Sequence, residues 1–214
     1  IKEGKTMVAK ENIIFKQGER MKDRKIIKPI PKIYRGIQYR STLEAKWAVF
    51  FDLCGWKYEY EPCNFNGWIP DFVLYDKFNV FVEIKPITCF QREVADKIVL
   101  SGCDTDVLLL GSAICPNSIQ GVDNIFGWHR QIMEEDSLDW MNGHQNNWAD
   151  AWFTFMNDKI GFCNVNGKWN DSLTGDYDDD RSVMLNDTYE EKVLSNWATA
   201  CNETQWKQVK GLTN

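Results

Sequence analysis

The chain has 214 residues, of which 43% are hydrophobic and 26% are charged, a balance that excludes collagen, a continuous coiled coil and wholesale disorder. No apolar run approaches the roughly 20 residues that a membrane-spanning helix needs, and residues 1–10 carry charges with no apolar segment behind them, which argues against a signal peptide. The net charge of −6 is uneven, because residues 1–40 carry +8 and the remainder carries −14. We therefore expect a cytoplasmic protein without a membrane partner, whose basic segment either suits a polyanionic partner or is a solvated leader.

The seven cysteines indicate the same compartment. Their number is odd and no two of them form a CxxC pair, which argues against a disulfide framework and against a zinc ribbon. Most have apolar neighbours in the sequence, so we expect reduced side chains in the core of the protein.

The first predicted helix begins at Ser41. Residues 1–33 before it are rich in lysine and lack sustained periodicity, so we expect a basic arm with at most a short helical or strand segment. Ser41 as N-cap and Glu44 three residues later form a capping box, and Gly55 is placed as a helix-ending glycine. The apolar positions repeat with helical spacing at Leu43, Trp47, Phe50, Phe51 and Cys54.

Three strands are predicted next, over residues 56–61, 69–75 and 80–84, with short turns between them. A helix over residues 91–100 and a buried strand over 106–110 follow. Short turns favour an antiparallel meander, and a helical crossover favours a parallel fourth strand. The predicted fold class is therefore α/β, with a mixed central sheet flanked by helices.

The second half of the chain is rich in aromatic residues, since seven of the ten tryptophans lie beyond residue 115. Strands are expected near residues 151–155 and 160–165, and a helix over 189–200. The acidic segment 171–191 is expected to be an exposed loop. The aromatic side chains favour a small β-rich core, with a stacking surface for unpaired bases as the alternative.

The residues that carry chemistry are Asp71, which follows Pro70, and the Glu83-Ile84-Lys85 segment of the next predicted strand. Glu83 and Lys85 are two apart on a strand and share one face, while Ile84 faces the core. A hairpin brings Asp71 beside Glu83. Two carboxylates and the Ile84 carbonyl make an oxygen-rich site of the kind that Mg²⁺ prefers, and a lysine there can orient water or stabilise developing negative charge on a phosphate.

Either element alone is common, because a Glu-x-Lys step on a strand usually forms a surface ion pair. Their combination at hairpin spacing after an amphipathic helix is more specific. Residues 39–85, which run from YRSTLEAKWAVFFDLCGWKYEYEP to WIPDFVLYDKFNVFVEIK, resemble the PD-(D/E)XK nuclease superfamily, especially compact members encoded by bacteriophages. The resemblance spans residues 32–111. It implies a restriction-endonuclease-like core of about four strands at 34–115, between a basic arm at 1–33 and a Trp-rich extension or small subdomain at 116–214.

The resemblance also implies roles for individual residues. Asp71 and Glu83 would bind Mg²⁺, with Mn²⁺ as a substitute, and the Ile84 carbonyl would join them. Lys85 would be the catalytic lysine. Glu44 would be the helix-borne acid that completes the metal site in many members, although the capping box explains Glu44 without any chemistry.

Three basic residues are candidates for contact with the nucleic-acid backbone: Arg35, Arg40 and Lys97. A guanidinium forks onto phosphate oxygens, so Arg40, close to the predicted site, can hold a phosphate or remain a solvated residue at the start of a helix. Lys97 and Gln91 lie on the helix after the Glu-x-Lys strand, where the alternative is a side chain that simply faces solvent.

The predicted function is a Mg²⁺-dependent endonuclease that hydrolyses DNA, and RNA cleavage shares the same chemistry. The alternative is a catalytically silent nuclease fold that binds nucleic acid or a host protein partner, because a body carrying −14 repels nucleic acid at long range. Two adjacent carboxylates favour the enzyme, since their repulsion without a cation costs stability. A homodimer or a protein partner stays open.

Overall fold

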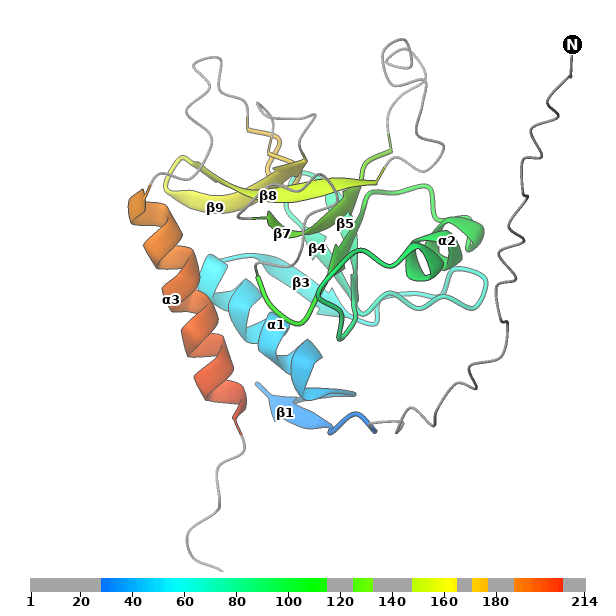
Figure 1. The fold of residues 1–214 in the computed structure, drawn as a ribbon, viewed down its shortest axis with the longest axis horizontal. Coiled ribbons are helices and arrows are strands. Elements are labelled where there is room, and N and C mark those ends of the chain that lie inside the picture. Colours follow the sequence, from blue (N-terminus) through cyan, green and yellow to red (C-terminus); the bar gives the residue numbers. More distant parts are fainter. Residues whose placement is uncertain (1–27, 115–124, 133–147, 165–170, 177–186, 206–214) are drawn as a thin grey trace, which may run out of the picture.

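The computed structural model describes residues 28–114, 125–132, 148–164, 171–176 and 187–205. Its centre is a seven-stranded mixed sheet in the order β3-β4-β5-β6-β7-β8-β9, and β1 and β2 form a separate hairpin (Figure 1). The predicted α/β class is therefore confirmed. The helices are α1 (Thr42–Cys54), α2 (Arg92–Leu100) and α3 (Asp187–Thr204). The strands are β1 (Lys32–Tyr34), β2 (Ile37–Tyr39), β3 (Lys57–Tyr60), β4 (Phe72–Tyr75), β5 (Asn79–Ile84), β6 (Val107–Leu110), β7 (Ile125–Arg130), β8 (Trp148–Met156) and β9 (Lys159–Asn164).

Helix α1 begins and ends at the residues that the sequence indicates. The Ser41 hydroxyl accepts the backbone N–H of Glu44, as an N-cap does. At the other end Gly55 adopts a left-handed backbone with φ of 76°, and its N–H reaches the carbonyls of Phe51 and Asp52. Only glycine enters that conformation without a steric penalty, so the helix ends here.

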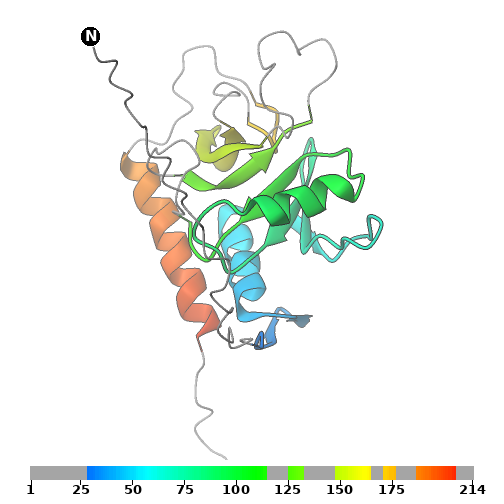
Figure 2. The same ribbon diagram turned by 45° about the vertical axis from the view of Figure 1, so that its right-hand side comes forward.

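The meander and the parallel strand are also confirmed. Strands β3, β4 and β5 pair antiparallel, and β6 pairs parallel to β5 after the crossover through α2. The four residues of β6 are all buried and alternate between the two faces of the sheet. Leu108 and Leu110 join the core that contains α1, whereas Val107 and Leu109 pack in clusters on the α2 side. Helices α1 and α2 therefore cover opposite faces of the sheet (Figure 2).

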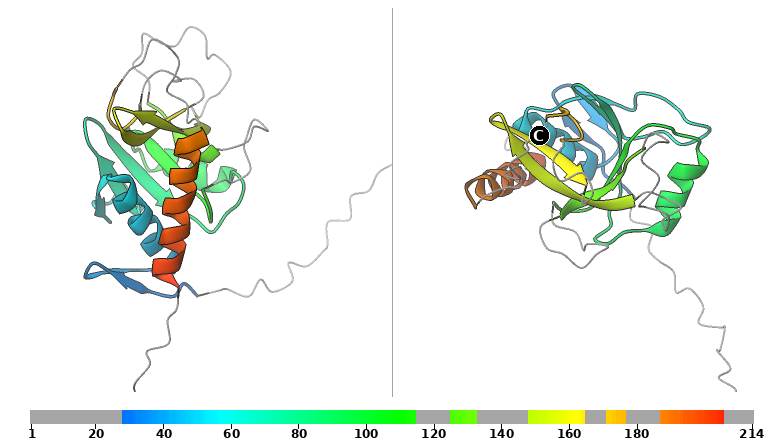
Figure 3. Two further views of the ribbon diagram at one scale, coloured as in Figure 1. Left: turned by 90° about the vertical axis from the view of Figure 1, so that its left-hand side faces the viewer. Right: turned by 90° about the horizontal axis from the view of Figure 1, so that it is seen from above.

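The second half of the chain extends the same sheet. Strands β7, β8 and β9 continue it by antiparallel pairing, and α3 packs along α1 (Figure 3). The Trp197 ring lies 4.6 Å from Trp47 and 5.6 Å from Phe50, measured between ring centroids. The strands predicted near 151–155 and 160–165 are present and longer than expected at their N-terminal ends. Phe126, Phe153, Phe162 and Trp197 therefore join the core that contains α1, whereas Trp128, Trp148 and Trp152 pack on the α2 side of the sheet.

The β1–β2 hairpin was not predicted from the sequence. Arg35 and Gly36 form its two-residue turn, both with positive φ, the backbone that tight hairpins prefer. The hairpin lies beside the end of α3, where the Lys32 ammonium donates to the Gln205 carbonyl at 3.1 Å (Figure 3). The Thr42 hydroxyl donates to the Ile30 carbonyl at 3.1 Å, so the chain before the hairpin meets the N-terminal end of α1.

Two expectations about the core are wrong. Of the described cysteines, Cys103 and Cys163 are buried, Cys54 and Cys201 are half-buried, and Cys63 and Cys89 are exposed, so most of them are not core residues. The segment 171–191 is not a plain exposed loop, because Asp171 is 2% exposed and α3 already begins at Asp187. Residues 177–186, which hold three of the eight acidic residues of this segment, lie outside the described residues. No helix in the described part of the chain is both long and apolar enough to cross a membrane.

Asp171 is buried because its carboxylate serves three donors. It accepts the Thr154 hydroxyl and, at 2.8 Å each, the backbone N–H groups of Leu173 and Thr174. A Cβ at Gly161 would overlap this carboxylate, so the strand opposite needs a glycine. Asp171 therefore fastens the 171–176 turn onto β8 and β9.

We expect Asp171→Ala to lower the free energy of unfolding by about 2–4 kcal/mol, because it leaves three donors without an acceptor in a buried site. Urea denaturation followed by circular dichroism measures this change. A loss below about 0.5 kcal/mol, the usual range for surface substitutions, would show that Asp171 does not hold the turn. Asp176→Ala, at a half-buried carboxylate in the same turn, is the matched control.

Candidate functional site

The pairing of β4 with β5 brings the predicted carboxylates together. Phe72 pairs with Val82 in this register, so Asp71, one residue before β4, lies across from Glu83. Both side chains are buried, with Asp71 4% and Glu83 5% exposed. The Asp71 Oδ2 atom accepts the backbone N–H of Ile84 at 2.7 Å, which fixes the carboxylate beside the end of β5.

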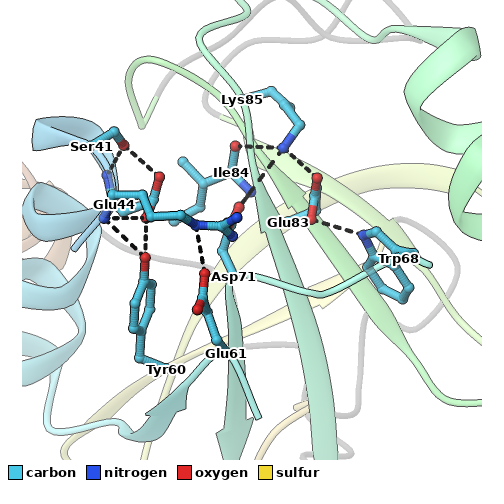
Figure 4. Close-up of polar contacts among 10 residues, drawn as sticks. Ser41, Glu44, Tyr60, Glu61, Trp68, Asp71, Glu83, Ile84 and Lys85 are labelled. Carbon is cyan, nitrogen blue, oxygen red and sulfur yellow. Dashed lines mark hydrogen bonds and ion pairs between the residues drawn. The ribbon is translucent and has the colours of Figure 1, made fainter. Parts of the chain in front are cut away.

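The ammonium group of Lys85 lies among three oxygens from different groups (Figure 4). Its Nζ forms an ion pair with Glu83 Oε1. It also donates to the Ile84 carbonyl at 3.2 Å and lies 4.0 Å from Asp71 Oδ2. Glu83 on β5 and Lys85 just after its end therefore lie on one face, as their spacing predicts, and Ile84 is 5% exposed and packs in the core.

Arg40 approaches the same group of acids from the start of α1. Its guanidinium pairs with Glu61 Oε1 at 2.5 Å and with Asp71 Oδ1 at 3.3 Å. The Arg40 side chain is 55% exposed, so it covers Asp71 while it still faces solvent. Arg40 is thus part of the site by position, whereas its predicted phosphate contact stays a prediction.

Glu44 belongs to an adjoining hydrogen-bond network, and its oxygens already have donors. Oε1 accepts the Ser41 hydroxyl at 2.7 Å. Oε2 accepts the Tyr60 hydroxyl at 2.5 Å and the Arg40 backbone N–H at 3.2 Å. The Ser41 hydroxyl and the Arg40 N–H thus hold this carboxylate beside the N-terminus of α1, and a metal-binding role for Glu44 would require its carboxylate to leave at least one of these donors.

The other basic candidates are not joined to these acids. Arg35 pairs with Asp52 Oδ1 at 3.1 Å, near the far end of α1 from Ser41, roughly 16 Å along the helix axis. Lys97 is exposed on α2, and Gln91 contacts the Cys89 sulfur at 3.2 Å. Their contact with nucleic acid stays a prediction.

The surroundings of Asp71 change its proton affinity. Burial is the largest cause, and with the negative charge of Glu83 it raises the pKa of Asp71 from 3.8 to about 7. The Lys85 ammonium and the N–H of Ile84 oppose this rise. Near neutral pH the buried carboxylate is therefore held close to its titration point, and any added cation would favour the ionised form.

This raised pKa predicts a pH-dependent stability effect for Asp71→Asn. Because the folded-state pKa lies above that of the unfolded chain, folded Asp71 keeps a proton that the unfolded chain has released, and stability falls as pH rises from about 4 to about 7. An asparagine oxygen can still accept the N–H of Ile84 but carries no charge. In EDTA at pH 8 we expect the variant to be more stable than wild type by about 1–3 kcal/mol, with a smaller gain at pH 5.

Urea denaturation at the two pH values measures this difference. Asp52→Asn is the control, at a carboxylate that pairs with Arg35 at the opposite end of α1. An effect of Asp71→Asn that is equal at both pH values would contradict a raised pKa of Asp71.

Three residues of the site were not singled out from the sequence: Tyr60, Glu61 and Trp68. Tyr60 reaches Glu44, and Glu61 reaches Arg40. The Trp68 indole N–H donates to Glu83 Oε2 at 2.9 Å. The alternation of Tyr58 and Tyr60 along β3 places their rings on one face, a signal for Tyr60. The Trp68 contact spans fifteen residues and has no local signal.

The oxygens around Lys85 Nζ also fit a divalent cation. They comprise two carboxylates and one backbone carbonyl, the hard ligands that Mg²⁺ prefers, and they already surround a positive charge. Within the described residues, no three His, Cys, Asp or Glu side chains group closely enough to form a metal site by themselves. The candidate ligand set therefore depends on the Ile84 carbonyl together with Asp71 and Glu83.

Comparison with protein-family models, with curated proteins and with solved structures finds no match for this chain.

Proposed function

We propose that the chain is a Mg²⁺-dependent nuclease with a restriction-endonuclease-like core, which hydrolyses phosphodiester bonds, most readily those of DNA. One observation carries the proposal. A cationic group, the Lys85 ammonium, is held among the oxygens of Asp71, Glu83 and Ile84. A buried pair of carboxylates is costly unless a positive charge offsets it. Hydrolysis of a phosphodiester also needs positive charge, beside the phosphate that is cleaved.

Asp71, Glu83 and the Ile84 carbonyl would hold Mg²⁺, with Mn²⁺ as a substitute. When bound, the cation supplies positive charge beside the scissile phosphate and makes water more acidic. The Lys85 side chain is 36% exposed, so its ammonium reaches both the buried oxygens and solvent. It can therefore orient the attacking water or stabilise the negative charge that develops on the phosphate.

Arg40 supports the binding of a phosphate at this position. Its guanidinium is held by Glu61 and Asp71, and the side chain is more than half exposed, so an incoming phosphate can exchange for one of these carboxylates. The β1–β2 hairpin and the described residues before it carry three further basic side chains: Lys28, Lys32 and Arg35. This positive segment offsets part of the acidity of the remaining chain.

The test is an incubation of the purified protein with single-stranded DNA, duplex DNA, branched DNA and RNA, each in Mg²⁺, Mn²⁺ or EDTA. Lys85→Ala and Asp71→Ala run alongside, with circular dichroism as a check of folding. Metal-dependent cleavage that is lost in both folded variants supports the proposal and identifies the substrate. If no substrate is cut, but nucleic acid or a protein partner binds equally to wild type and both variants, the catalytically silent alternative replaces it.

A further inference from the structure

Trp68 contacts the candidate site from the connection between β3 and β4. Its indole N–H donates to Glu83 Oε2 at 2.9 Å, whereas Glu83 Oε1 faces Lys85 (Figure 4). The two oxygens of Glu83 are thereby distinguished, since one is held by an uncharged donor and the other faces the cation. Trp68 is itself 3% exposed, so this hydrogen bond is sheltered from water.

The backbone around Trp68 is fixed by a miniature hairpin. Phe65 and Trp68 exchange two backbone hydrogen bonds, of 2.7 Å and 2.9 Å. Asn66 and Gly67 between them both have positive φ, 46° and 93°, as the turn of a two-residue hairpin requires. The Asn66 side chain donates to the Ser101 carbonyl at 2.8 Å, which fastens the hairpin to the end of α2.

The ring of Trp68 is fixed as well. It stacks on Phe65 with 5.7 Å between ring centroids, and Phe65 meets Phe81 of β5 edge to face at 4.9 Å. Phe81 lies two residues before Glu83 on the same strand. The Trp68 ring is therefore held against β5 through Phe65 and Phe81, and Glu83 is itself a residue of β5. Donor and acceptor are thus both fixed relative to this strand, which gives the hydrogen bond a defined direction.

We propose that Trp68 is a positioning residue for Glu83: its N–H holds one carboxylate oxygen, so that the other is directed at the cation-binding position. The proposal rests on the proposed function, because it assigns Trp68 to a carboxylate that binds Mg²⁺. A hydrogen bond to an ionised acceptor is short and about twice as strong as a neutral one. It restricts rotation of the carboxylate, so that Oε1 stays directed at the position where a cation would bind.

The test is the affinity for Mn²⁺, measured by isothermal titration calorimetry on wild type and Trp68→Phe. Phenylalanine keeps most of the buried ring and removes the donor. Hydrogen-bond partners of metal ligands contribute about 10–100-fold to metal affinity, so we expect the Mn²⁺ dissociation constant to rise by about that factor. Urea denaturation of both proteins records any change in stability separately.

Trp56→Phe is the matched control. The Trp56 indole is also buried and donates to a backbone carbonyl, that of Ile160, at 2.6 Å, but it packs in the core with α1 and not in the cluster that contains Trp68. We expect this variant to lose stability while its Mn²⁺ affinity equals that of wild type. A purely structural role for Trp68 would give the same pattern in Trp68→Phe, and that result would overturn the proposal.

Glu83→Gln separates this proposal from the proposed function. If wild type binds Mn²⁺, Glu83→Gln does not, and Trp68→Phe binds as wild type does, only the positioning role fails. If wild type itself binds no Mn²⁺, the proposed site fails and the role of Trp68 fails with it.

A second measurement covers the case that Trp68→Phe does not fold. In wild type labelled with ¹⁵N-tryptophan, we expect one indole N–H resonance to shift as Mg²⁺ saturates the site. The same resonance should also shift in Glu83→Gln, which assigns it to the hydrogen-bonded indole. If no indole resonance responds to both changes, Trp68 does not position Glu83.

Discussion

We expect Lys85→Met to lower the rate of phosphodiester cleavage at saturating Mg²⁺ by about 10²–10³-fold, the usual cost of removing one group that stabilises transition-state charge. Methionine approximates the length of the lysine stem and lacks the ammonium. In the structure that ammonium contacts Glu83 and the Ile84 carbonyl, and the Lys85 side chain is 36% exposed, so Lys85, like Arg40, is a cation at these carboxylates that can face substrate. Single-turnover cleavage of the best substrate measures the effect.

Metal binding should respond in the opposite direction. The Lys85 ammonium occupies the oxygens that would receive Mg²⁺, so its removal abolishes a competing cation. We expect Lys85→Met to bind Mn²⁺ at least as tightly as wild type in calorimetry, although it scarcely cleaves. Lys57→Met, at an exposed lysine on β3, is the control and should change neither property. A variant that cleaves within threefold of the wild-type rate would remove Lys85 from the catalytic role.

Glu83→Gln is expected to lose both properties. The glutamine keeps the shape of the side chain and can still accept the Trp68 N–H, but the site then has one carboxylate instead of two. Because direct ligands contribute more than the 10–100-fold of their hydrogen-bond partners, the Mn²⁺ dissociation constant should rise by at least about 100-fold. Cleavage at moderate Mg²⁺ concentrations should fall in parallel.

Calorimetry with Mn²⁺ and the cleavage assay on the same preparations measure these effects. Glu59→Gln, at an exposed carboxylate of β3, is the matched control for the loss of one negative charge. Glu83→Gln also removes the repulsion between Glu83 and Asp71, so it should remain folded. Mn²⁺ binding by Glu83→Gln as tight as that of wild type would place the cation elsewhere.

Helix α1 and the strands around the candidate site could be predicted because their signals are local. The capping box at Ser41 and Glu44, the helical repeat of apolar residues and Gly55 all lie within one segment, and the structure shows the same ends. The shared face of Glu83 and Lys85 follows from the pleat of one strand. Asp71 needs only the short β4–β5 hairpin to reach them.

Other features depend on contacts between distant segments. Strand β7 was not predicted, because five of its six residues are buried and such a strand shows no alternation of apolar and polar positions. The packing of α3 on α1 joins Trp197 to Trp47, 150 residues away in the sequence. The burial of Asp171 likewise depends on donors from β8 and its own turn, so an acidic segment alone indicated a loop.

The candidate site likewise contains residues with a local sequence signal and residues that reach it from distant segments. Asp71, Glu83 and Lys85 belong to a pattern with fixed spacing, and the structure brings them together. The partners that orient them do not belong to it. Trp68 reaches Glu83 through a separate hairpin, and Glu61 reaches the site only through Arg40, which also pairs with Asp71.

The most direct test of the proposed function is the Mg²⁺ dependence of cleavage by wild type and by Asp71→Asn, a variant that we expect to fold with added stability. The proposal predicts that wild-type cleavage rises with Mg²⁺ to a plateau, stops in EDTA and returns when Mg²⁺ is restored, while folded Asp71→Asn cleaves at no Mg²⁺ concentration. Cleavage by wild type that continues in EDTA, or equal cleavage by Asp71→Asn, would contradict a metal-dependent nuclease site at Asp71 and Glu83.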